Sequence, residues 1–194
     1  MRIDKPRYLR TLAVETARMS YPGRMGSVLR KGAKQTTMRY FAHEFQLIDL
    51  WRSPAQVAHS YDKWHRQQSR RLALRLEPKL VKKNFYTAQA AAAKLINTFH
   101  HQLMKYERFR PLYRFLHLPL DQIVFRELRR WAKHEQSQAL KPILPLLRRN
   151  PYTLTYREYM RIQTALAELL PELRRDNRLP ITSRVDLNPV LWAR

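Results

Sequence analysis

The sequence contains no cysteine among its 194 residues. Without thiols the chain cannot form disulfides, thiolate zinc sites or a cysteine nucleophile, so these three kinds of chemistry are excluded. Glycine is also scarce, with only 3 residues in the whole chain. Because β-sandwiches need many glycine-rich turns, this shortage favours helices, which the 12 prolines would separate from one another.

Acidic residues are few, because 15 Asp+Glu stand against 38 Lys+Arg and leave a formal net charge of +23. A hydrophobic content of 44% is enough to build a core, so the charge belongs to a folded body rather than to a disordered basic tail. Such a body attracts polyanions, of which nucleic acid and anionic lipid are the main examples. Arginine predominates over lysine, which suits phosphate recognition, although a GC-rich gene would produce the same bias.

Long apolar runs are missing as well. No stretch approaches the roughly 18–20 apolar residues that span a bilayer, and no short apolar segment follows the basic N-terminus as in a secretory signal. We therefore expect a soluble or membrane-peripheral protein.

Apolar residues recur at spacings of three and four along much of the chain, which is the pattern of amphipathic helices. The expected helices cover residues 6–19, 38–51, 53–76, 79–108, 120–140 and 155–170. The strongest signal lies at 79–108, where Phe85 and Phe99 are both predicted to face the core. Thr155 and Glu158 have the spacing of a capping box at the start of the last helix. The pattern predicts a mainly α protein, an irregular bundle of about five to six helices.

Two segments lack helical periodicity. Residues 20–37 hold all three glycines with several basic residues and no acid, which predicts a basic N-terminal loop. Residues 172–194 contain prolines and little periodicity, which predicts an extended C-terminal tail. We therefore divide the chain into a basic N-terminal helix and loop extension at 1–37, a helical body at 38–170 and an extended tail at 171–194.

The sequence shows no catalytic template. It has no glycine-rich phosphate loop and no HExxH motif, and the 7 histidines do not fall four residues apart on one helix face. His100 and His101 are adjacent, so on a helix they point in different directions. The carboxylates show no spacing that acid–base catalysis requires. We therefore predict no enzymatic activity, no small-molecule substrate, no cofactor and no metal, and we interpret the histidines as surface or partly buried packing residues.

Basic residues alternate with aromatic ones, the combination that binds irregular RNA through phosphates and unpaired bases. Tyr40, Trp51 and Tyr113 are candidates for stacking on bases, although helical spacing favours them as core residues. The predicted RNA-binding residues are Arg24, Arg30, Lys31, Lys34, Arg39, Arg52, Lys63, Arg66, Arg70, Arg71, Arg75, Lys79, Lys82 and Lys83.

These features favour a structural component of a large ribonucleoprotein, most readily a mitochondrial ribosomal protein that binds rRNA and neighbouring proteins. The mitochondrial location rests on the first 40 residues, which are rich in arginine and poor in acid like an import sequence, although Asp4 and Glu15 weigh against a cleaved one. One alternative is an accessory subunit of a mitochondrial membrane complex, an ATP synthase or respiratory assembly, that contacts anionic lipid. Another is a DNA-binding protein, which the lack of a helix-turn-helix signature disfavours.

Overall fold

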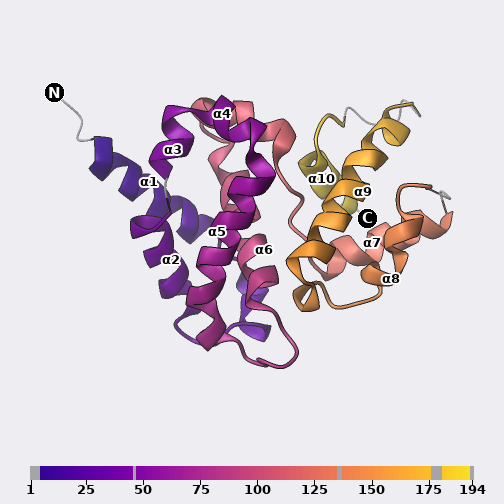
Figure 1. Ribbon diagram of the computed structural model, residues 1–194, viewed down its shortest axis with the longest axis horizontal. Coiled ribbons are helices and arrows are strands. Elements are labelled where there is room, and N and C mark those ends of the chain that lie inside the picture. The colour runs from indigo at the N-terminus through magenta and orange to yellow at the C-terminus, as the bar shows by residue number, and fades with distance from the viewer. Residues whose placement is uncertain (1–4, 46, 135–136, 176–180, 193–194) are drawn as a thin grey trace.

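The computed structural model describes residues 5–45, 47–134, 137–175 and 181–192. These residues form a helical bundle, so the predicted mainly α class is confirmed (Figure 1). The α-helices are α1 (Lys5–Ser20), α2 (Ala33–His43), α3 (Leu47–Arg52), α4 (Pro54–His59), α5 (Tyr61–Leu76), α6 (Ala88–Leu103), α7 (Gln122–His134), α8 (Leu144–Leu147), α9 (Tyr156–Arg175) and α10 (Leu187–Trp192). Short 3₁₀ helices connect them, namely η1 (Gly23–Ser27), η2 (Glu77–Lys79), η3 (Glu107–Phe115), η4 (Lys141–Ile143), η5 (Pro151–Thr153) and η6 (Arg184–Asp186).

The helices enclose two hydrophobic cores, and Figure 1 shows them side by side, with α1–α6 on one side and α7–α10 on the other. The first core includes Leu12 of α1 and Leu72 of α5, whereas the second includes Leu128 of α7 and Leu166 of α9. Helix α6 serves both, since Phe99 belongs to the first core while Ala93, on the same helix, belongs to the second. The two halves therefore share one helix.

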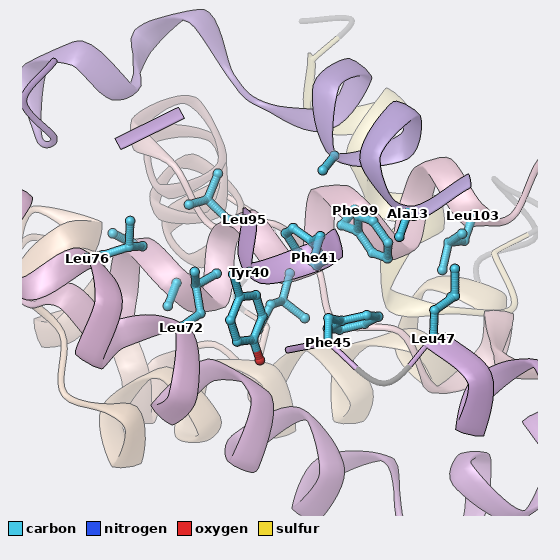
Figure 2. Packing of buried hydrophobic residues seen from close by; sticks show 14 of the residues in the cluster. Ala13, Tyr40, Phe41, Phe45, Leu47, Leu72, Leu76, Leu95, Phe99 and Leu103 are labelled. Atoms are coloured by element: carbon cyan, nitrogen blue, oxygen red, sulfur yellow. The ribbon is translucent and has the colours of Figure 1, made fainter. Parts of the chain in front are cut away.

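Stacked aromatic rings fill the first core (Figure 2). The rings of Phe41 from α2 and Phe99 from α6 are almost parallel, with centroids 4.0 Å apart and an interplanar angle of 10°. Phe45 meets Phe99 edge-on at 5.0 Å. Residues 90–93 of α6 are alanines that are all buried, so α5 approaches closely and packs against α6 over a long contact. All three phenylalanines are buried, so the predicted burial of Phe99 is confirmed.

The helix predicted at 79–108 is wrong at both ends. Thr87 caps α6, because its hydroxyl accepts a hydrogen bond from the Ala90 amide at 3.2 Å, so the helix begins at Ala88. The preceding stretch instead pairs with the N-terminal segment through a single antiparallel bridge between Leu29 and Leu80. Phe85 therefore lies in a loop with 52% of its surface exposed, and its predicted burial is wrong.

Three other predicted helices differ from expectation, because two are divided and one is longer. The segment 38–51 is divided between α2 and α3, and the segment 53–76 between α4 and α5, which are separated at Ser60. Helix α9 begins at Tyr156, within the predicted capping box. The Thr155 hydroxyl accepts from the Glu158 amide, and the Glu158 carboxylate accepts from the Thr155 amide. The helix then continues past Pro171 to Arg175.

The loop and the tail are both more ordered than predicted. Within residues 20–37 the chain forms η1, buries Met25 fully, and starts α2 after Gly32, whose φ of +89° favours glycine. Within the tail, Ser183 and Asp186 form a capping box that opens η6 and α10. The division at 1–37, 38–170 and 171–194 stays a prediction, but the buried residues group differently, because Leu191 completes the second core.

We expect the two phenylalanines to respond differently to truncation. Phe99→Ala should cost about 3–5 kcal/mol of unfolding free energy, because it empties a stacked position in the core. Phe85→Ala should change it by less than about 0.5 kcal/mol, because the ring is half exposed. Urea denaturation followed by circular dichroism measures both, and equal losses would contradict the placement of Phe85 outside the core.

Candidate functional site

The bridge between Leu29 and Leu80 brings two basic segments together that lie about fifty residues apart in the sequence. The Arg30 amide donates to the Lys79 carbonyl at 2.7 Å, and the Val81 amide donates to the Val28 carbonyl at 2.9 Å. Arg30 from one segment lines the same hollow as Lys82 and Lys83 from the other, so basic side chains of the two segments share one surface. We call it the bridge surface, and it consists of Arg30, Lys31, Lys79, Lys82, Lys83 and Phe85.

Phe85 is the aromatic member of the bridge surface. It lines a shallow hollow of about 560 Å³ together with Arg30, Lys82 and Lys83. Its ring packs edge-on against Tyr86, with centroids 5.0 Å apart and an interplanar angle of 70°. Because Tyr86 is partly buried against the first core, it supports the exposed ring from below. Sequence periodicity assigned Phe85 to the core, whereas the Lys-Lys-Asn run before it is a signal for a loop.

The other predicted RNA-binding residues are dispersed. Lys34 and Arg39 are exposed on α2, and Lys63, Arg66, Arg70 and Arg71 are exposed on α5. Arg75 binds both carboxylate oxygens of Glu44, so it already has an anionic partner. Arg52 is the last residue of α3 and comes just before α4, which leads into the start of α5, whereas Lys79 of the bridge surface follows the end of α5. The Arg24 side chain lies outside the part of the structure that we describe.

Two further basic residues, which the sequence did not single out, join part of this set. Arg157 and Arg161 of α9 face Lys63 and Arg66 of α5 across a groove of about 690 Å³. We call this the α5–α9 groove. Its lining comprises Asp62, Lys63, Arg66, Ala139, Pro142, Ile143, Tyr156, Arg157, Met160, Arg161, Thr164, Ala165 and Glu168. The spacing of Arg157 and Arg161 is a signal that they share one face of α9. It does not indicate that this face lines a groove with α5.

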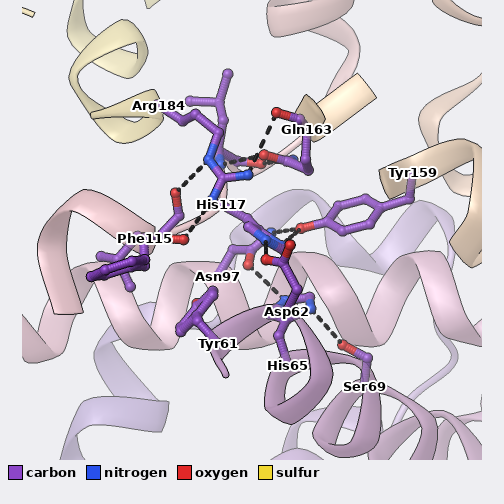
Figure 3. Close-up of polar contacts among 12 residues, drawn as sticks. Tyr61, Asp62, His65, Ser69, Asn97, Phe115, His117, Tyr159, Gln163 and Arg184 are labelled. Atoms are coloured by element: carbon purple, nitrogen blue, oxygen red, sulfur yellow. Dashed lines mark hydrogen bonds and ion pairs between the residues drawn. The ribbon is translucent and has the colours of Figure 1, made fainter. Parts of the chain in front are cut away.

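A network of hydrogen bonds lies behind this groove, where the two cores meet (Figure 3). Asp62 accepts from His117 Nε2 at 2.8 Å, and the Nδ1 atom of His117 lies 2.8 Å from the Tyr159 hydroxyl. The same hydroxyl accepts from the Asn97 side-chain amide at 2.8 Å. Four residues from α5, α6, the segment before α7 and α9 are thus joined in one chain.

The network continues from Asn97 to the wall of the groove. Asn97 Oδ1 lies 2.9 Å from His65 Nε2, and His65 Nδ1 lies 2.9 Å from the Tyr156 hydroxyl. We assign neutral histidines with the proton on Nε2, because this choice gives every hydrogen bond one donor and one acceptor. The arrangement is therefore satisfied without an excess proton.

Burial keeps these histidines neutral. His65, His100 and His117 are fully enclosed, and desolvation lowers the pKa of each well below the usual 6.5. The Tyr61 hydroxyl, 2.6 Å from Nδ1, is the partner of His100, while His100 Nε2 has no partner among the described residues. The interpretation of the histidines as surface or partly buried residues is therefore wrong for these three.

Two of the stacking candidates are also placed by the structure. Tyr40 is fully buried and donates to Gln68 Oε1 at 2.7 Å, so it is a core residue, as helical spacing favoured, and cannot stack on a base. Tyr113 is partly buried and its hydroxyl donates to Asp186, which anchors η6 to η3. The Trp51 side chain lies outside the described part.

No three His, Asp or Glu side chains in the described ranges lie close enough together to hold a metal ion. Among the helices described, none is long and apolar enough to cross a membrane. Comparison of the chain with protein families, with curated protein sequences and with solved structures finds no match.

The buried histidines predict a loss of stability in mild acid. Their pKa values are lower in the folded than in the unfolded state, so stability is complete above about pH 6.5 and falls below it, by up to about 1.4 kcal/mol per pH unit for each histidine. Unfolding free energies measured from pH 7.5 to 5.5 test this. His100→Gln, which keeps an acceptor for Tyr61, should reduce the slope by about a third. The exposed His59→Gln is the matched control, and a slope that neither variant changes would contradict the assignment.

The hydroxyl of Tyr159 should matter more than that of another buried tyrosine. Tyr159→Phe leaves the Asn97 amide nitrogen and His117 Nδ1 without their partner, which should cost about 1–3 kcal/mol for each buried group. Tyr152→Phe is the control, because among the described residues the hydroxyl of Tyr152 reaches only the Met25 sulfur at 3.5 Å, a weak acceptor. We expect thermal unfolding to separate the two variants clearly, and similar melting temperatures would show that the network contributes little.

Proposed function

We propose that this protein is a structural, RNA-binding component of a ribonucleoprotein and that it holds irregular RNA on the bridge surface. The observation that carries the proposal is the half-exposed Phe85 ring among the cations of that surface. Neither residues 16–43 nor residues 78–106 contain Asp or Glu. No carboxylate of these two segments therefore neutralises the cations of the bridge surface. Phosphates would bind the cations while an unpaired base stacks on the ring.

RNA fits this surface better than a lipid headgroup does. Stacking a base on an aromatic ring contributes about 1–3 kcal/mol, and each phosphate contact releases counterions. One exposed ring flanked by lysines buries too little apolar surface for stable attachment to a membrane. The proposal therefore ranks RNA above anionic lipid as the polyanion.

The particle we propose is a ribosome, and a mitochondrial one in particular. A net charge of +23 on a folded body is best neutralised by a large RNA. The acid-poor, arginine-rich first 40 residues support import into mitochondria. Neighbouring proteins of the particle would cover further parts of the surface.

RNA binding should depend steeply on salt. If about six phosphates are contacted, log K should fall against log salt with a slope of about −4 to −5. The double variant Lys82→Ala with Lys83→Ala should make the slope shallower by about 1 to 2, because it removes two phosphate contacts. Phe85→Ala should weaken binding to a single-stranded loop about tenfold and leave the slope unchanged, since stacking releases no counterions. Filter-binding titrations measure all of these.

The control is Arg148→Ala, which removes one exposed cation far from the bridge surface in the sequence and should change little. A salt slope near zero would overturn the proposal. Hydrogen exchange of residues 20–37 separates the alternatives, because RNA should protect this segment whereas cardiolipin vesicles should not. Protection by the vesicles alone would favour the membrane-complex alternative.

A further inference from the structure

We propose that the α5–α9 groove binds a single nucleotide whose base is unstacked from its neighbours, with the phosphate held between the two helices. The groove is separate from the bridge surface, and it combines an apolar floor with a cationic rim. Its volume of about 690 Å³ lies within the range of roughly 300–1,000 Å³ that small-molecule sites occupy. The inference rests on the proposed RNA binding for its biological role, but it is tested with free nucleotides.

The floor of the groove suits a flat apolar ligand. Pro142 and Ile143 of the segment before α8 lie opposite Met160 and Ala165 of α9. Met160 is partly buried, and its flexible, polarisable side chain packs well against aromatic rings. A nucleobase would cover these side chains and leave its edges toward the open side.

The rim supplies positive charge from both helices. Lys63, Arg157 and Arg161 are exposed and make no ion pair with any residue in the described ranges. Two carboxylates also line the groove, and one of them, Asp62, already accepts from His117. With Arg66 the cations number four against two acids, so the rim attracts an anion.

The wall between floor and rim is held in place before any ligand arrives. Arg66 lies over the Tyr156 ring, 5.8 Å from its centroid, so its guanidinium is ordered at the edge of the groove. The Tyr156 hydroxyl is bound to His65 in the buried network. A site that is already ordered loses less conformational freedom on binding, which favours affinity for a small ligand.

A nucleotide matches this arrangement better than a fatty acid or an acidic peptide. Cations of both α5 and α9 line the same groove as the apolar floor, so a phosphate can bind at the rim while the attached base covers the floor. A fatty acid needs a deep apolar tunnel, whereas this groove is open along one side. An acidic peptide would satisfy the rim but would leave the flat floor without an aromatic partner.

The test is a titration of the folded protein with adenosine monophosphate, followed by NMR of methionine methyl groups. We expect the Met160 methyl to shift in a saturable manner, because it lines the groove. Met19 is the internal control, since it is 50% exposed and lies beside a different hollow. Adenosine and inorganic phosphate, each added alone, should bind more weakly than the nucleotide because each uses only part of the site.

Two pairs of variants separate the site from the general charge of the protein. Thr164→Trp fills the groove without changing charge and should abolish the Met160 shift, whereas Ala167→Trp, exposed on the same helix but outside the groove, should not. Arg161→Ala should weaken nucleotide binding about fivefold or more, consistent with loss of one charge-assisted contact. Arg148→Ala should leave it unchanged.

The outcomes distinguish this inference from the proposed function. At about 10 mM nucleotide even weak sites fill. If the NMR signal of the Met160 methyl does not shift up to that concentration, the groove is not a nucleotide site. A shift produced by an acidic peptide or a fatty acid but not by the nucleotide would overturn the inference as well. RNA binding with a steep salt slope that persists in Thr164→Trp would then show that the bridge surface alone holds RNA. If RNA does not bind but the nucleotide still shifts Met160, the proposed function is overturned and the groove remains a nucleotide site.

Discussion

The arrangement of this protein depends on one buried hydrogen-bonded chain that joins its two hydrophobic cores. Asn97 is at its centre, because its amide donates to Tyr159 of α9 while its carbonyl accepts from His65 of α5. Apolar packing alone would let the two halves shift against each other, since it is not directional. Hydrogen bonds in a buried setting fix the relative positions of the helices, because any mismatch leaves a polar group unpaired. The facing walls of the α5–α9 groove are a direct result of this junction.

Charge is the second constraint. The buried polar groups are neutral or paired, as with Lys94 and Asp121, whose charged atoms lie 3.3 Å apart with little exposure. Most of the remaining positive charge lies on the surface, where it opposes folding by self-repulsion unless a polyanion is bound. The described core therefore holds its charged groups in pairs, whereas a few neutral buried atoms, such as His100 Nε2, lack a hydrogen-bond partner among the described residues.

Local patterns predicted the fold class and several helix starts, but not the tertiary neighbours. The Thr155 and Glu158 spacing predicted the start of α9, and helical periodicity placed Phe99 in the core. Periodicity failed at Phe85, because the bridge to the N-terminal segment outweighed the local helical tendency. It also could not show that His65 and His117 share a buried network or that His100 is buried beside Tyr61, since the partners described above lie 32 to 91 residues away in the sequence. Composition alone indicated that basic residues form the candidate site. Their grouping into the bridge surface depends on the long-range pairing of Leu29 with Leu80, which composition does not show.

The bridge between Leu29 and Leu80 links ligand binding to the stability of the protein against unfolding and proteolysis. It closes a loop of about fifty residues that contains α2 to α5, so a polyanion held across it would hold together the ends of most of the first core. By mass action, a ligand at one hundred times its dissociation constant adds about 2.7 kcal/mol to stability. In the proposed RNA-binding role, copies without RNA would unfold more often and be removed by proteases sooner than bound copies. The amount of protein would then follow the amount of its RNA, without any dedicated regulator.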